Sequence, residues 1–111
     1  MEGRPRRVVT LVEGFLAAPA STSAALRRAI VERAQAVALG QVGALPDVPN
    51  TIAPWVEKIA LNANLATDSD IETLTRSGLS EDEVLEITEA AALGASLARL
   101  DAGLAAIRAE S

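Results

Sequence analysis

The sequence predicts an all-α protein, and three observations lead to this prediction. Hydrophobic residues make up 50% of the 111 residues and alanine is the commonest residue, whereas Phe15 and Trp55 are the only aromatic residues. This composition favours closely packed helices, because sheets are enriched in aromatic and β-branched residues. Apolar residues recur at steps of three and four, and no segment alternates polar and apolar residues. A chain of this length has the size of one domain, so residues 1–111 are expected to fold as a single helical unit.

Two helices are predicted in the first 40 residues. Apolar side chains line one side of residues 8–18, and Pro19 ends that segment. A second helix is expected over residues 24–39, between a Ser-Thr-Ser cap and Gly40. The polar face of this helix is expected to be exposed and to carry an ion pair between residues four apart. That face consists of Arg27, Arg28, Glu32 and Gln35.

Three further helices are predicted over residues 52–65, 68–77 and 81–108. Pro54 is tolerated in the first turn of the third helix, where its missing N–H has no role. Thr67 is expected to cap the fourth helix and Gly78 to end it. Ser80 and Glu83 form a capping box that opens the long last helix.

The last helix offers two adjacent surfaces. An apolar seam consists of Leu93, Leu97, Leu100, Leu104 and Ile107. Beside it, Ala90, Gly94 and Ala98 recur every four residues, which predicts that another helix backbone approaches closely there. We expect one surface to pack within the chain and the other to meet a second subunit, with Trp55 as an anchor of the core or the interface. Glu110, near the frayed end, is expected to contribute little.

Charge limits the classes of partner. The net charge is −5, with a basic excess over residues 1–33 and an acidic excess over residues 67–90. An acidic chain with one lysine and two aromatic residues is a poor candidate for binding nucleic acid. No membrane span is expected, since the uncharged stretch 90–98 is far shorter than the roughly 20 apolar residues a span needs. Glu13 and Gly14 interrupt the N-terminal apolar stretch, so we expect a cytoplasmic protein rather than an exported one.

Two absences exclude much of the chemistry of active sites. There is no Cys and no His, which removes disulfides, thiol catalysis, thiolate or imidazole metal ligands and the usual proton shuttle. Residues 68–72 carry the alternating carboxylates of a calcium loop, but Thr73 and Leu79 stand where that loop needs glycine and glutamate. These acids are therefore interpreted as favourable first-turn residues of a helix, and neither a metal nor a cofactor is expected.

One polar cluster remains as a candidate site. Its members are Lys58, Asn62, Asn64, Asp68 and Asp70, with Glu57 beside them. Lys58 is the one residue that can serve as a base or a Schiff-base amine if it is buried. The alternative is a solvated helix face, which is the usual environment of a lysine.

Residues 54–107 resemble the carboxymuconolactone decarboxylase superfamily, which includes the AhpD-like alkylhydroperoxidases. The resemblance is carried by SGLSEDEV at 77–84, AAALGA at 90–95 and the Arg99-Leu100 pair. It implies an AhpD-like bundle of about five to six helices that assembles as a trimer or a larger ring. The Cys-x-x-Cys-x-x-x-His motif of the peroxidases would fall on Ala63, Ala66 and Asp70, so thiol-dependent peroxide reduction is excluded.

These observations together favour a non-redox, homo-oligomeric scaffold or binding protein. One alternative is an enzyme of unknown substrate that uses the polar cluster, and another is a helical protein-interaction module unrelated to the superfamily. A closed pocket around Lys58 or Asp70 would favour the enzyme, and a filled apolar core would favour the scaffold.

Overall fold

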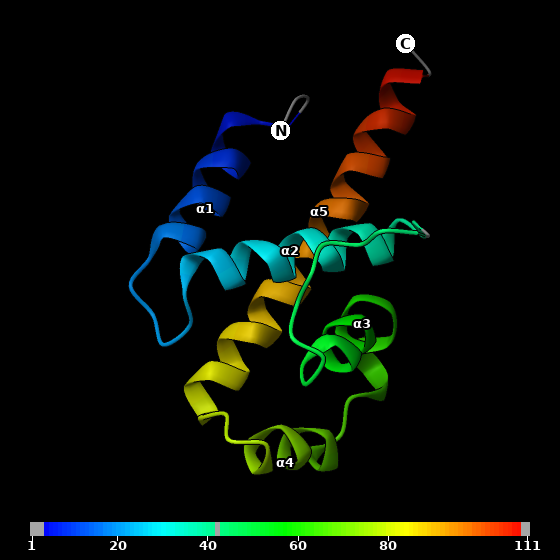
Figure 1. Ribbon diagram of the computed structural model, residues 1–111. Coiled ribbons are helices and arrows are strands. Elements are labelled where there is room, and N and C mark those ends of the chain that lie inside the picture. Colours follow the sequence, from blue (N-terminus) through cyan, green and yellow to red (C-terminus); the bar gives the residue numbers. More distant parts are fainter. Residues whose placement is uncertain (1–3, 42, 110–111) are drawn as a thin grey trace.

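The chain folds into helices joined by short loops, in the order shown in Figure 1. The computed structural model describes residues 4–41 and 43–109. The elements are α1 (Arg6–Ala17), α2 (Ala24–Ala38), α3 (Ala53–Asn62), the 3-10 turn η1 (Ala63–Leu65), α4 (Asp68–Arg76) and α5 (Glu81–Ala109). No strand occurs in these described ranges, which confirms the all-α prediction and its five helices. Glu110 lies outside the described residues.

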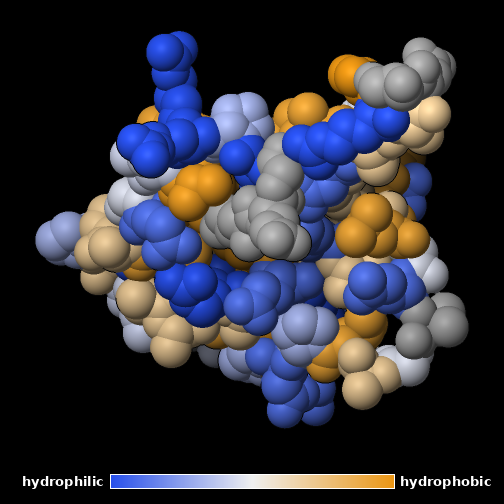
Figure 2. All heavy atoms as spheres, turned by 90° about the horizontal axis from the view of Figure 1, so that it is seen from above, coloured by the Kyte–Doolittle hydropathy of each residue, from blue (hydrophilic) through white to orange (hydrophobic). Residues whose placement is uncertain are grey.

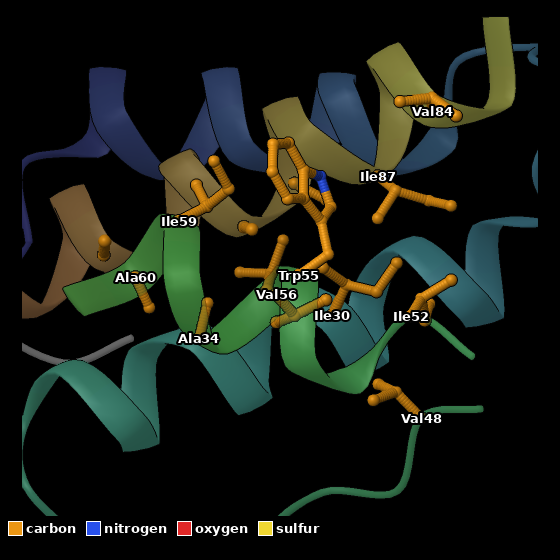
Figure 3. Close-up of a cluster of buried hydrophobic side chains, with 14 of the residues drawn as sticks. Ile30, Ala34, Val48, Ile52, Trp55, Val56, Ile59, Ala60, Val84 and Ile87 are labelled. Carbon is orange, nitrogen blue, oxygen red and sulfur yellow. The ribbon is translucent and has the colours of Figure 1, made fainter. Parts of the chain in front are cut away.

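The long helix α5 organises the fold. It crosses α2 near its middle, with α3 and α4 on one side of α2 and with α1 and the last turns of α5 on the other (Figure 1). The molecule is accordingly elongated, at 51 × 28 × 25 Å. Ile30, Val56 and Ile87 are the largest fully buried side chains, one each from α2, α3 and α5. Figure 3 shows these three helices meeting around Trp55 and Ile59.

The backbone of α2 lies directly against α5 at Gly94. A Cβ atom added to Gly94 would lie 2.3 Å from the carbonyl oxygen of Val31 and 2.8 Å from the Cβ of Ala34. Ala90 and Ala98, one turn to either side, are 0% and 2% exposed. The small-residue strip therefore packs within the chain, as one of the two predicted surfaces of the last helix.

Local capping fixes where α4 and α5 begin. The hydroxyl of Thr67 accepts the amide of Asp70 at 3.2 Å, and the Asp70 carboxylate accepts the amide of Thr67 at 3.0 Å. Ser80 and Glu83 make the same reciprocal pair at 3.1 and 3.0 Å. Between the two helices Gly78 takes φ 108°, a left-handed conformation that suits glycine at the end of a helix. Both predicted caps are confirmed, and they give Asp70 and Glu83 a structural role at these helix starts.

Arg27 contradicts the prediction of an exposed polar face. It is 2% exposed, and its guanidinium donates to the carbonyls of Leu16, Ala18 and Thr22. The last turn of α1 and the loop after it lie against the first turn of α2, so their carbonyls need a buried donor there. From α5, the carboxylate of Glu86 accepts both the amide and the hydroxyl of Thr22, at 2.7 and 2.6 Å. These hydrogen bonds to Thr22 hold the pKa of Glu86 below its ordinary value.

The remaining polar residues of α2 also make contacts outside the predicted pattern. Arg28 pairs with Glu13 of α1 at 3.4 Å rather than with Glu32, so the predicted ion pair within the helix is wrong. Gln35 is half-buried and donates to Asp101 of α5 at 3.1 Å. Glu32 is exposed, as predicted.

Candidate functional site

Lys58 and Asp70, two of the five candidate residues, meet between α3 and α4. The Nζ atom of Lys58 donates to Oδ2 of Asp70 at 2.7 Å, and their side chains are 32% and 30% exposed. They line a pocket of about 270 Å³ together with Trp55, Thr73 and three other residues, and this pocket is open to solvent. The hydrogen bond from Lys58, followed by the one from the Thr67 amide, lowers the pKa of Asp70. The pocket is not the closed site that an enzyme was expected to show.

The other three candidates do not join this pair. Asn62 ends α3, Asn64 lies in the 3-10 turn and Asp68 begins α4, and all three are exposed. Oδ2 of Asp70 accepts both Lys58 and the amide of Thr67. Protonation of this oxygen would therefore weaken the cap of α4. Glu57 is also engaged elsewhere, since it accepts Arg33 of α2 at 2.8 Å.

Trp55 separates the polar pocket from a second cavity. Its side chain is 6% exposed, and its indole N–H donates to the hydroxyl of Thr88 on α5 at 2.9 Å. That hydroxyl donates in turn to the carbonyl of Val84 at 2.7 Å. The indole is thus held in one orientation between α3 and α5 (Figure 3), which confirms the prediction of a core residue.

The second cavity is an apolar groove between α4 and α5, which we call the α4–α5 groove. Its volume is about 480 Å³, and Trp55 and Val84 form its floor. Ile71 of α4 and Leu85 of α5 form its walls and are 42% and 56% exposed. One acid stands on each wall, Glu72 and Glu81. Sequence reasoning missed this groove, although two large apolar residues within an acidic stretch and outside the predicted stripes were the available signal.

A third groove lies at the other end of the molecule, between α1, α2 and α5. Its volume is about 340 Å³, and its apolar lining residues are Val12, Leu16, Val31 and Leu97. Arg4 crosses towards α5 and makes a two-pronged ion pair with Asp101, at 2.8 and 2.7 Å. This pairing raises the pKa of Arg4 and lowers that of Asp101. Figure 2 looks onto this end, where hydrophobic side chains reach the surface among hydrophilic ones.

Metal and membrane sites were both expected to be absent. Within the described ranges, no three acidic side chains come together in a way that would hold a metal ion. By length and composition α5 qualifies as a membrane-spanning helix, and 33% of its apolar window is buried. Core helices meet the same criterion, and α5 packs against α2 and α3. The absence of a membrane partner therefore remains a prediction of the sequence.

Comparisons with protein-family models, curated proteins and solved structures found no match for this chain. The resemblance of residues 54–107 to the AhpD-like proteins, and the ring assembly that it implies, stay predictions.

Proposed function

We propose that this protein is a non-catalytic, homo-oligomeric scaffold whose subunits join through α1 and the C-terminal part of α5. The observation that carries this proposal is the change in burial of the leucine seam along α5. Leu97 is 3% exposed and contacts the core of its own chain. Leu100 and Leu104, one and two turns further on, are only half-buried, and α5 continues past α2 to Ala109. The seam is therefore less buried towards the C-terminal end of α5 than it is at Leu97.

The geometry of this end suits a second copy of the chain. Leucines at steps of three and four form the surface into which a partner helix packs its own side chains. The groove beside the seam has an apolar floor, and its lining comes from α1, α2 and α5. α1 and the last turns of α5 lie on the same side of α2 (Figure 1). A ring of three or more subunits, as the resemblance implies, in which the α5 end of each subunit enters the groove of the next, buries both apolar surfaces and closes on itself.

The polar cluster supports a structural role rather than an active site. Only Lys58 and Asp70 meet, and their contact braces α4 against α3. Asn62, Asn64 and Asp68 are exposed and do not line the pocket that Lys58 and Asp70 share. With no His and no Cys, the chain lacks the imidazole that most often transfers protons near neutral pH and the thiol that is the most reactive side-chain nucleophile.

Light scattering coupled to size-exclusion chromatography tests the assembly at micromolar concentration. We expect a mass that is a multiple of 11.5 kDa, and a monodisperse monomer would overturn the proposal. Leu104→Glu is expected to yield monomers, because it places a charge in the seam. Leu85→Glu is the control, since Leu85 is 56% exposed near the other end of the same helix, 19 positions from Leu104. Circular dichroism checks that both variants keep the helical content of the wild type.

A further inference from the structure

We infer that the α4–α5 groove is a docking site for a basic amphipathic helix of another protein. This inference goes beyond the proposed assembly, because the groove lies at the opposite end of α5 from the seam. Leu85 and Leu104 are 19 positions apart in the helix, which is about 28 Å at 1.5 Å per residue. The two surfaces can therefore be occupied at the same time.

The shape and lining of the groove fit an incoming helix. Its volume of about 480 Å³ falls within the range of ordinary ligand sites. Ile71 and Leu85 leave large apolar surfaces exposed on opposite walls, above a floor of Trp55 and Val84. Two helical walls with an apolar floor form the type of groove in which an amphipathic helix buries its apolar face.

The walls are fixed before any partner arrives. The capping boxes at Thr67 and Ser80 hold the starts of α4 and α5. Leu74 is 5% exposed and anchors α4 in the core, and the hydrogen bond from Trp55 to Thr88 fixes the floor. A preorganised site loses little conformational entropy on binding.

Charge selects the chemistry of the partner. Glu72 and Glu81 stand at the edges of the groove, one on each wall. Asp68, Asp82 and Glu89 are also exposed on the same two helices. The sequence from 67 to 90 contains one basic residue, Arg76, which pairs with Glu72 at 3.4 Å. This negatively charged rim attracts the lysine and arginine side chains that flank an apolar face of a partner helix. It repels anionic membranes and nucleic acids.

The chain's own basic helix is already engaged. α1 begins with Arg6 and Arg7, but its apolar side chains Val12 and Leu16 are each 3% exposed in the core. Docking α1 of a second copy into the groove would require these side chains to leave their own core. The occupant is therefore a helix from a different protein.

The single tryptophan makes the groove directly observable. Trp55 lies in its floor and the chain has no tyrosine, so intrinsic fluorescence reports binding at the indole, in this groove or in the polar pocket beside it, and variants of the groove walls tell the two apart. The probe is an 18-residue peptide of leucine and lysine without aromatic residues, with leucines spaced to form one helical face. We expect a saturable change in Trp55 emission and a gain of peptide helicity. A scrambled peptide of the same composition, and a peptide with glutamate in place of lysine, are expected to give no saturable change.

Matched variants locate the binding. Leu85→Ala and Ile71→Ala are expected to weaken the binding of the lysine peptide roughly tenfold, because each removes an apolar wall. Leu61→Ala serves as the control, since Leu61 and Leu85 are both 56% exposed, and it is expected to leave the affinity unchanged. Glu72→Gln is expected to weaken binding a few-fold and to reduce its dependence on salt. Leu85→Ala is expected to keep the oligomeric mass of the wild type. Loss of peptide binding and loss of assembly can therefore be told apart.

Three results would overturn the inference. The first is the absence of a saturable fluorescence change with the lysine peptide. The second is equal weakening by Leu61→Ala and Leu85→Ala, which would place the peptide elsewhere. The third is a shift in Trp55 emission when the protein alone is diluted through its dissociation range, which would show that a second copy occupies the groove.

Discussion

Replacing Gly94 by alanine tests the central contact of the fold. The added Cβ atom would lie 2.3 Å from the Val31 carbonyl oxygen and 2.8 Å from the Cβ of Ala34. Real Cβ atoms essentially never approach closer than 3.0 Å, so α2 and α5 must move apart. The nearest atom belongs to the backbone of α2, which cannot turn away as a flexible side chain would.

Two opposing effects set the size of the change. Alanine is favoured over glycine inside a helix by about 1 kcal/mol. Overpacking of a well-filled core costs about 1–3 kcal/mol, and a contact with backbone belongs at the upper end of that range. Gly94→Ala is therefore expected to destabilise the protein by about 1–2 kcal/mol, which corresponds to a loss of about 4–10 °C in Tm.

Gly103, on the same helix, is the matched control. No atom lies within 4 Å of the Cβ that alanine would add there. Gly103→Ala is expected to stabilise the protein by about 0.5–1 kcal/mol through helix propensity alone. Urea denaturation at one fixed protein concentration measures both variants, because assembly contributes to apparent stability. If Gly94→Ala raised stability as much as Gly103→Ala, the close packing of α2 on α5 would be refuted.

Three further predictions concern polar contacts. Arg27→Met should cost about 3 kcal/mol or more in urea denaturation, because buried carbonyls lose a charged donor; a loss below about 1 kcal/mol would contradict this. Ser80→Ala should lower the free energy of unfolding by about 0.5–2 kcal/mol, because it removes the cap of α5. Calcium should leave the wild-type Tm unchanged, and a calcium-dependent rise in Tm would indicate a metal site. The pKa values of Asp70, Glu86 and Asp101 are lowered in the folded state. Their stabilisation is thus present above the ordinary pKa, about 4, and is lost as pH falls below it; Glu86→Gln should flatten this dependence in urea midpoints measured from pH 6 to 3.

Local signals explain why the helices could be predicted from the sequence. Ser23, Thr67 and Ser80 each accept a backbone amide three residues on, and the helices begin directly after them. These caps depend on neighbouring residues alone, so their positions can be recognised without the tertiary structure. The third helix was expected to reach residue 65, but regular α-helix ends at Asn62 and a 3-10 turn follows. No glycine or proline marks that change.

Tertiary contacts explain what the sequence did not show. Arg27 lies on the same helical face as Ile30, Val31 and Ala34, so spacing alone would have placed it inside. Its charge nevertheless predicts an exposed position, because an arginine is rarely fully buried without a partner. The partners are carbonyls of the last turn of α1 and of the loop after it, whose positions depend on how α1 returns to α2. Lys58 and Asp70 were predicted as members of one cluster, and their contact follows from the direction that α4 takes after the 3-10 turn.

The two proposed surfaces share one rigid element. Between the groove at Leu85 and the seam at Leu104, α5 packs its small residues against the backbone of α2, with Gly94 at the closest point. A helix held in this way cannot bend freely, so a partner bound in the groove is kept at a fixed distance and angle from the assembly end. An oligomer built through the seam then presents one such groove per subunit. A partner with two basic helices would bind it more tightly than it binds a single subunit, provided that its linker spans two grooves.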